Sequence, residues 1–404
     1  MKFGYSFALV APIATLALGA CKGDDASTGT SASARATDWS GSAEVSTYAE
    51  FAAALEAAAA LPEGDAGVDE LDPFRIVVTA SIDDGFADHG ALEYEGQVDL
   101  HIVGEGDEPP TIDAGGHSPI LVDGTSHSTD AGAVYLENLR FIGGKESDSL
   151  SGAGAIDGLR VTVQSSHFEN NVTSGLGGAI SDAVAIRDST FERNRSERRG
   201  GAVVLAEDGA VIEGSTFRGN YAERNGGAVL VRAGISAEIR DSTFADNTVD
   251  HTRSMGGAIS ASDGLTIEGS TFESNRAQLW AGAIFLGPDN RASDRRSRPL
   301  VIRDSRFVGN EGERSSSRGG AIYANAHCDR DAGDEITFED TTFEGNRAGT
   351  GAVLYSECDA GEVQITRSTF SDNDDPVLRL SSDVRLVDGG DNRFEGDEPP
   401  DWTP

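Results

Sequence analysis

The feature that most constrains the fold is a motif, Phe-x-x-Asn, that occurs eight times between residues 168 and 373. Each of the first seven copies is followed within a dozen residues by Gly-Ala-Ile or Gly-Ala-Val. The copies begin 23 to 36 residues apart, and periods of this size are typical of solenoids, in which one structural unit stacks on the next. The motif phenylalanines are Phe168, Phe191, Phe217, Phe244, Phe272, Phe307, Phe343 and Phe370, and Phe141 and Phe394 extend the series.

Each repeat also carries an apolar residue five positions before its Phe. Side chains alternate between the two faces of a strand, so an offset of five buries both residues only if the chain bends between them. Asp or Gly, which favour turns, stands at this bend in most repeats, for example at Asp188 and Gly214. We therefore expect two short strands around a corner, and a third strand in the Gly-Ala-Ile or Gly-Ala-Val segment.

Three short strands per repeat, without a helical period, predict an all-β fold: a parallel β-helix of about ten to twelve coils. Parallel coils stack about 4.8 Å apart, which would bring the motif Phe rings into one buried stack. The motif Asn residues would share one corner, where each amide can bond to the coils on either side. The Gly before each Ala would allow a tight corner or a close approach of two backbones.

The combination of Phe-x-x-Asn with Gly-Gly-Ala-Ile resembles the repeats of the chlamydial polymorphic outer-membrane protein family, over roughly residues 130 to 375. The resemblance implies a right-handed β-helix that is displayed on a cell surface, often in an adhesive role. Proteins of that family end in a membrane β-barrel. We expect the repeats without such a barrel here, because no run of barrel strands is recognisable after them.

The N-terminus predicts export. Residues 1–20 have the pattern of a signal peptide, with Lys2 before an apolar stretch and Leu-Gly-Ala directly before Cys21. This ending resembles a bacterial lipobox, which implies that Cys21 is lipidated and anchors the protein in the outer membrane. The β-helix would then face the medium or the periplasm. The alternative is an ordinary secretory signal with a Cys at this place by chance.

The rest of the chain divides into a tether, a β-helix and a tail. Residues 21–43 are rich in Gly, Ser, Thr, Ala and Asp and are expected to form a flexible tether. The parallel β-helix is expected to span residues 44–396. Residues 46–61 favour a helix, which we expect to cap the first coil, because an open solenoid end exposes its core and an unpaired strand edge. Residues 397–404 are assigned to a C-terminal tail.

Two further cysteines, Cys328 and Cys358, follow the Gly-Ala motifs of consecutive repeats at nearly the same distance. Stacked coils would bring their Cα atoms within disulfide range, and an exported protein meets an oxidising environment. We therefore predict a disulfide between them. The alternatives are two buried free thiols or a chemical role, but no Cys-x-x-Cys is present, and the nearby His327 has no second ligand at metal spacing.

The formal charge of −36 disfavours binding to nucleic acid or to bare anionic membrane. The segments between each motif Asn and the next Gly-Ala, which we expect to be short, variable loops, differ in charge because they carry more arginines than acidic residues. In stacked coils they would form a stripe that binds an acidic glycan or a surface protein, unless the arginines only pair locally, as in Glu197–Arg198 or Glu223–Arg224. The candidate stripe residues are Arg195, Arg198, Arg199, Arg224, Arg276, Trp280, Arg314 and Arg318.

No cofactor is expected. Calcium is an alternative, because the acidic segments 372–375 and 388–391 offer oxygen ligands, although neither matches a known calcium loop. We expect a non-catalytic protein of display, adhesion or ligand binding. The rival is a polysaccharide lyase or hydrolase, which would need a carboxylate pair or a calcium cluster with a base. Neither is evident from the motifs, and the chain has only three Lys to serve as a base.

Overall fold

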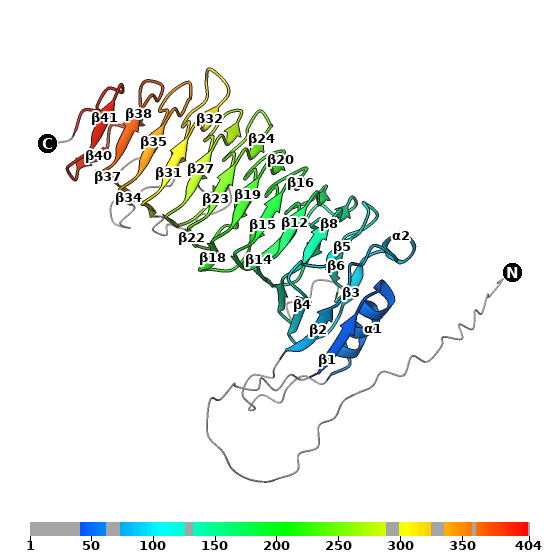
Figure 1. Ribbon diagram of the computed structural model, residues 1–404. Helices are drawn as coiled ribbons and strands as arrows, with labels where there is room; N and C mark the ends of the chain where they lie inside the picture. Colours follow the sequence, from blue (N-terminus) through cyan, green and yellow to red (C-terminus); the bar gives the residue numbers. More distant parts are fainter. Residues whose placement is uncertain are drawn as a thin grey trace, which may run out of the picture. The chain divides into compact units, whose positions relative to one another are not determined.

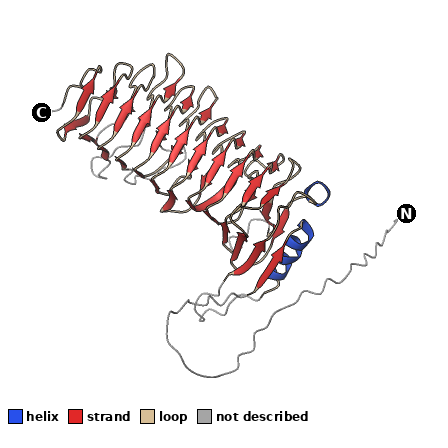
Figure 2. Cartoon of the chain, in the orientation of Figure 1, coloured by secondary structure: helices blue, strands red, loops and turns tan. Residues whose placement is uncertain are grey.

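The computed structural model describes residues 41–61, 73–125, 132–287, 299–324, 335–357 and 361–402. From residue 41 onward the chain winds into a parallel β-helix, with strands in every coil and helices near its N-terminal end (Figures 1 and 2). The strands with the series of Phe residues lie in one parallel sheet of 11 strands, whose first strand, β5, has Ile112 at the Phe position. With one such strand per coil, this number agrees with the predicted ten to twelve coils. The strands are β5 (Thr111–Asp113), β8 (Arg140–Ile142), β12 (His167–Glu169), β15 (Thr190–Glu192), β19 (Thr216–Arg218), β23 (Thr243–Ala245), β27 (Thr271–Glu273), β31 (Arg306–Val308), β35 (Thr342–Glu344), β38 (Thr369–Ser371) and β41 (Arg393–Glu395).

The predicted aromatic stack is present along this sheet. From Phe141 to Phe394 the ring centroids of neighbouring coils lie 4.7 to 5.2 Å apart, close to the spacing of the strands themselves. The rings from Phe168 to Phe370 are fully buried. Each such ring contributes about 2–3 kcal/mol of burial free energy, before the entropy cost of folding.

A second face precedes the Phe strands and holds the apolar residue found five positions before each Phe. Ile212, for instance, pairs with Ile186 and Ile239 and is fully buried, as the sequence pattern predicts. The strands of this face are β1 (Ser42–Val45), β2 (Phe74–Val78), β4 (Leu100–Gly104), β7 (Val134–Glu137), β11 (Val161–Gln164), β14 (Ile180–Arg187), β18 (Ala210–Glu213), β22 (Ala237–Arg240), β26 (Leu265–Glu268), β30 (Leu300–Arg303), β34 (Glu335–Glu339), β37 (Gly361–Thr366) and β40 (Val384–Asp388).

The bend between these two faces lies where the sequence places it. Asp188 and Asp241 adopt left-handed backbone angles, with φ of 47° and 48°. From Asp188 to Asp304 glycine alternates with Asp at this corner, and the space beside each of these glycines is taken by the Asp before it. A Cβ on Gly214 would lie 2.5 Å from Asp188 Oδ1, and one on Gly269 would lie 2.3 Å from Asp241 Oδ1. The Asp side chain of one coil thus fills the space that a side chain at the same corner of the next coil would need.

The Gly-Ala segments lead into a third face, called here the groove face. Its strands are β3 (Leu92–Tyr94), β6 (Leu121–Asp123), β10 (Ile156–Asp157), the first part of β14, β17 (Val203–Leu205), β21 (Val229–Val231), β25 (Ile259–Ala261), β29 (Ile284–Leu286), β33 (Ile322–Ala324), β36 (Leu354–Ser356) and β39 (Leu378–Leu380). β14 runs through the corner and joins this face to the second, so that the two form one sheet of 23 strands.

The segment after each motif Asn is more regular than expected. Instead of a variable loop, the two residues after each of the first six motif Asn residues form a short strand, and these six strands together with β9 make a parallel sheet of seven strands. The strands are β9 (Lys145–Glu146), β13 (Val172–Thr173), β16 (Arg195–Ser196), β20 (Tyr221–Ala222), β24 (Thr248–Val249), β28 (Arg276–Ala277) and β32 (Glu311–Gly312). The expectation of loops alone is therefore wrong, because strands of two residues are too short to show a period in the sequence.

The motif Asn residues form a continuous buried ladder of hydrogen bonds. Asn220 Oδ1 accepts bonds from the backbone N–H and the side-chain amide of Asn194, at 3.0 and 3.1 Å. Its own Nδ2 donates to Asn247 Oδ1 at 3.0 Å and to the Phe191 carbonyl at 2.9 Å. The same pattern joins the eight motif residues Asn171, Asn194, Asn220, Asn247, Asn275, Asn310, Asn346 and Asn373.

Both ends of the stack are closed. The expected capping helix is present as α1 (Tyr48–Ala59), which packs on β1, β2 and β3 and buries Phe51, Leu55 and Ala58. A second short helix, α2 (Phe86–His89), places Phe86 against Tyr48. β1 begins at Ser42, within the segment assigned to the tether.

The C-terminal end is closed by residues assigned to the tail. Asp397 accepts both hydrogen bonds that Asn373 donates onward, at 2.9 Å from its backbone N–H and 2.7 Å from its side-chain amide. Trp402 meets the last ring of the stack, Phe394, edge to face. A carboxylate suits the last position of the ladder, because it accepts hydrogen bonds and needs no acceptor beyond it.

We predict that Asn247→Asp destabilises the protein by about 3 kcal/mol, because the carboxylate would face two buried oxygen acceptors and donate to neither. Asp397→Asn is the matched control and should change stability by less than about 1 kcal/mol, since an amide oxygen still accepts at the end of the ladder. Urea unfolding followed by circular dichroism measures both. Equal midpoints for Asn247→Asp and the unmutated protein would contradict the role of the ladder.

Candidate functional site

The structure divides the eight candidate stripe residues among several rows. Arg195 and Arg276 lie on the outer side of the two-residue strands. Arg198 and Arg224 lie in the segments that follow these short strands in two neighbouring coils. Arg224 donates its backbone N–H to the Arg198 carbonyl. A row of isolated parallel bridges connects Arg199, Asn225, Met255, Trp280, Arg318 and Thr350 along successive coils.

The charged side chains mostly pair between coils. The Arg195 guanidinium lies over the Tyr221 ring at 4.2 Å, and Arg276 lies 3.9 Å from Glu311. Arg314 donates to Gln278 Oε1 at 2.6 Å. Among the described residues, neither Glu197–Arg198 nor Glu223–Arg224 forms an ion pair. The stripe residues therefore lie in several rows, and two of the eight, Arg199 and Trp280, line the cavity described next.

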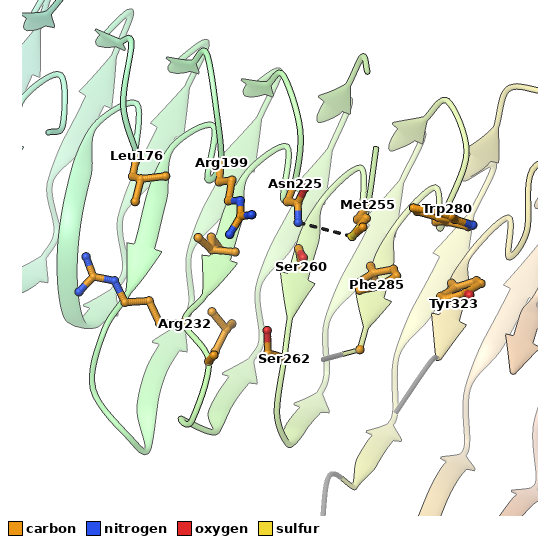
Figure 3. A pocket seen from close by; sticks show the side chains of 14 residues that line it. Leu176, Arg199, Asn225, Arg232, Met255, Ser260, Ser262, Trp280, Phe285 and Tyr323 are labelled. Carbon is orange, nitrogen blue, oxygen red and sulfur yellow. Dashed lines mark hydrogen bonds between the residues drawn. The ribbon is translucent and has the colours of Figure 1, made fainter. Parts of the chain in front are cut away.

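That cavity is a groove of about 330 Å³ on the groove face (Figure 3). One side is the bridge row, in which Leu176, Arg199, Asn225, Met255 and Trp280 follow one another across five coils. The floor is the row of outward-pointing residues at the centre of the strands, among them Leu230, Ser260, Phe285 and Tyr323. Arg232 and Ser262 also line the groove.

Strand alternation explains the floor. In β21, Val229 and Val231 point into the core, so Leu230 between them points outward. The same central position holds Ser260, Phe285, Tyr323 and Tyr355 in the next coils. These outward residues are covered well enough that Phe285 is only 5 % and Tyr323 only 2 % exposed.

The aromatic residues form a cluster of their own outside the main core. The Phe285 and Tyr323 rings stack at 5.2 Å, Tyr323 and Tyr355 at 5.4 Å, and Trp280 lies 6.1 Å from Tyr323. Together with Ala281 and Met255 they form a second hydrophobic cluster. Since the coils do not need these rings for their core, the cluster supplies an apolar platform beside the groove.

Glu357 ties the far end of this platform together. It accepts a 2.6 Å hydrogen bond from the Tyr323 hydroxyl and pairs with Arg318, whose guanidinium lies over the Tyr355 ring at 5.0 Å. Burial, and then the Glu357 carboxylate, raise the pKa of Tyr323 well above its usual value. Tyr323 therefore stays a neutral hydrogen-bond donor at any physiological pH.

The other end of the groove is polar and charged. Arg232 pairs with Asp182 at 2.5 Å, and Asp182 accepts a 2.9 Å hydrogen bond from Ser181. Asp182 lies where the register between β14 and β17 shifts. At this bulge two residues of β14, Ser181 and Asp182, stand opposite one residue of β17. Asp157 follows Ile156, which pairs with Ile180 of β14, and burial raises the pKa of Asp157, with a further contribution from Asp182.

Some predicted sites lie outside the described residues. Cys21, Cys328 and Cys358 are among these, so the lipid site and the disulfide remain predictions. In the described ranges no three His, Cys, Asp or Glu side chains are grouped to hold a metal ion. Of the acidic segments considered for calcium, Asp374 pairs with Arg347, and Asp388 accepts bonds from Gly390 and Asn392.

The fold and the groove define the class of this protein: a parallel β-solenoid with a lined groove on one sheet. A family model described as right-handed β-helix region matches residues 120–290 and 201–397, so the chain belongs to the right-handed β-helix family. Comparison with curated proteins and with solved structures gave no match. No helix in the described ranges is long and apolar enough to cross a membrane.

Sequence reasoning missed most of the groove lining, including Met255, Phe285 and Tyr323. The signal that could have predicted the floor of the groove is the residue directly after each Gly-Ala-Ile or Gly-Ala-Val motif. In Gly-Ala-Ile-Phe285 and Gly-Ala-Ile-Tyr323 an aromatic residue follows a buried Ile, and alternation then directs it outward.

We predict that Asp157→Asn changes how stability depends on pH. Because the pKa of Asp157 is raised by folding, the native state holds a proton that the unfolded chain releases, so this group makes stability fall as pH rises above the ordinary Asp value near 4. The amide of the variant cannot titrate. The Asp157→Asn variant should therefore lose less stability between pH 4 and 7 than the unmutated protein does. Thermal unfolding across this pH range measures it, and parallel curves would contradict the assignment.

Proposed function

We propose that this protein binds a polysaccharide in the groove without cleaving it. The observation that carries the proposal is the ring of Trp280, which is partly exposed at the groove and is supported by the buried rings of Phe285 and Tyr323, beside the hydrogen-bonding side chains of Asn225 and Ser260. Concave sites with aromatic walls and a few placed polar groups are typical of small-molecule and sugar-sized ligands. The apolar faces of sugar rings suit such a platform, and their hydroxyls suit the polar groups.

The charge of the lining favours an acidic polysaccharide. Arg199 and Arg232 line the end of the groove away from the aromatic cluster, in a protein of formal charge −36. An extended chain fits better than a compact ligand, because the bridge row continues over successive coils, each about 4.8 Å from the next. A ligand along this row would place carboxylate or sulfate groups near the arginines and sugar faces on the rings.

Catalysis is the second candidate, and Asp157 beside Asp182 is the observation that favours it. Glycoside hydrolysis uses a pair of carboxyl groups, one of which has a raised pKa, as Asp157 has here. Against this role, Asp182 is held by Arg232 and Ser181, and Asp157 accepts a bond from the Ala153 backbone N–H. We propose that these groups stabilise the bulge in β14.

We further propose that the protein is a lipoprotein of the outer membrane, anchored through Cys21, which presents the groove at the cell surface. The sequence around Cys21 supports this, as does the separation of the signal and tether from the coils. Binding of a polysaccharide would then hold the cell to a matrix, in line with the adhesive role that the resemblance implies.

We predict that Trp280→Ala weakens polysaccharide binding by about 10-fold or more, because truncating an aromatic anchor in a binding site typically costs more than 1 kcal/mol. The measurement is calorimetry with alginate, polygalacturonate, chondroitin sulfate and neutral dextran. The acidic polymers should bind more tightly than dextran.

Tyr135→Ala is the matched control, because Tyr135 is 41 % exposed and lies on β7 of the second face. It should leave affinity unchanged. The same mixtures are assayed for new reducing or unsaturated ends, which should not form. Equal affinities of Trp280→Ala and Tyr135→Ala would contradict the groove as the binding site, and released ends would favour catalysis.

We also predict that Cys21→Ser moves the protein from the membrane fraction to the soluble fraction of its host, since a serine cannot carry the lipid. Cell fractionation and mass spectrometry of the mature N-terminus measure this. Proteinase treatment of intact cells then tests whether the coils face the medium. Membrane association that survives Cys21→Ser would disprove the anchor.

A further inference from the structure

One corner of the solenoid departs from its own pattern beside the groove. The corner residue that stands three positions before the groove-face strand has a left-handed backbone in the seven coils from residue 177 to residue 351. In six of these coils it is glycine: Gly177, Gly200, Gly226, Gly256, Gly319 and Gly351. In the remaining coil the residue is Ala281, with φ of 57°. Ala281 directly follows Trp280 in the chain.

Glycine has a clear steric reason at this corner. A Cβ on Gly256 would lie 2.0 Å from the Ile259 carbonyl oxygen, and one on Gly319 would lie 2.1 Å from that of Ile322. Real Cβ atoms do not approach so closely, so the coil that contains Ala281 must open between Ala281 and the Ile284 carbonyl. An alanine with this backbone also costs about 1 kcal/mol relative to glycine.

The methyl group that causes this strain lies in the aromatic cluster. Ala281 is fully buried and packs with Phe285 and Tyr323, against which Trp280 and Met255 also lie. Phe285 directly follows Ile284, at whose carbonyl the corner has to open. The strained residue therefore touches the rings of the groove from below, while its backbone fixes the start of the strand that carries Phe285.

We propose that Ala281 is a positioning residue of the groove: its β-carbon packs in the buried cluster that supports Trp280 and so sets this ring in the arrangement that receives a sugar face. The proposal rests on polysaccharide binding in this groove. Strain held at a functional site is stabilised by the structure around it, and here the well-packed coils on either side supply that support. Relief of the strain should therefore improve folding and impair the site.

The test compares Ala281→Gly with Ala281→Ser, which keeps the β-carbon, in the full chain. Ala281→Gly should raise the melting temperature by about 1–3 °C and weaken binding of the tightest acidic polymer, among alginate, polygalacturonate and chondroitin sulfate, by about 3- to 10-fold. Ala281→Ser should keep the affinity within about 2-fold. Gly351→Ala is the control for strain alone, since this corner lies outside the groove lining, and it should lower stability without changing affinity.

A second readout does not need a ligand. Acrylamide quenching of Trp280, taken as the difference between each variant and its Trp280→Phe counterpart, should increase in Ala281→Gly and stay unchanged in Gly351→Ala. If Ala281→Gly is more stable but keeps both its affinity and its quenching, Ala281 has no positioning role. If no polymer binds any variant, polysaccharide binding is wrong, and the quenching alone decides whether Ala281 positions Trp280.

Discussion

The spacing between coils is the constraint on which the rest of this structure depends. Parallel backbone hydrogen bonds fix it near 4.8 Å, so any residue type repeated at one coil position must pack on copies of itself. Phenylalanine meets this condition with stacked rings 4.7 to 5.2 Å apart, and asparagine with an amide that both donates and accepts along the stack. Where neither fits, glycine is required: a Cβ on Gly178 would lie 1.9 Å from the Gly201 carbonyl oxygen.

The same constraint separates structural positions from those open to function. Inward positions and corners repeat because each coil imposes them on the next. Outward positions on the strands are under no such demand, and on the groove face they change from Leu230 to Ser260 and Phe285 within three coils. Aromatic residues at outward positions are therefore informative in a solenoid, since the core does not require them.

This difference also decides what the sequence could predict. The Phe stack, the Asn ladder and the corner at Asp188 were predictable because they recur in most coils between residues 168 and 373. The groove was not, since its lining is defined by differences between coils. Arg198 and Arg199 are adjacent in sequence, but of these two only Arg199 lines the groove. Arg199 belongs to the bridge row and directly precedes the corner at Gly200. The charge excess thus merged several rows of residues into one stripe, and which of these residues bind a ligand stays a prediction.

Solenoid energetics explain how one coil can tolerate an unfavourable residue. Each coil contacts only its neighbours, so the cost of Ala281 is confined to the coils around it, whereas the Phe and Asn ladders continue through the same coil without interruption. Phe272 and Asn275 keep their stacking and hydrogen bonds a few residues before the strained corner. A site built on one face can therefore depart from the repeat while the opposite face holds the stack in register.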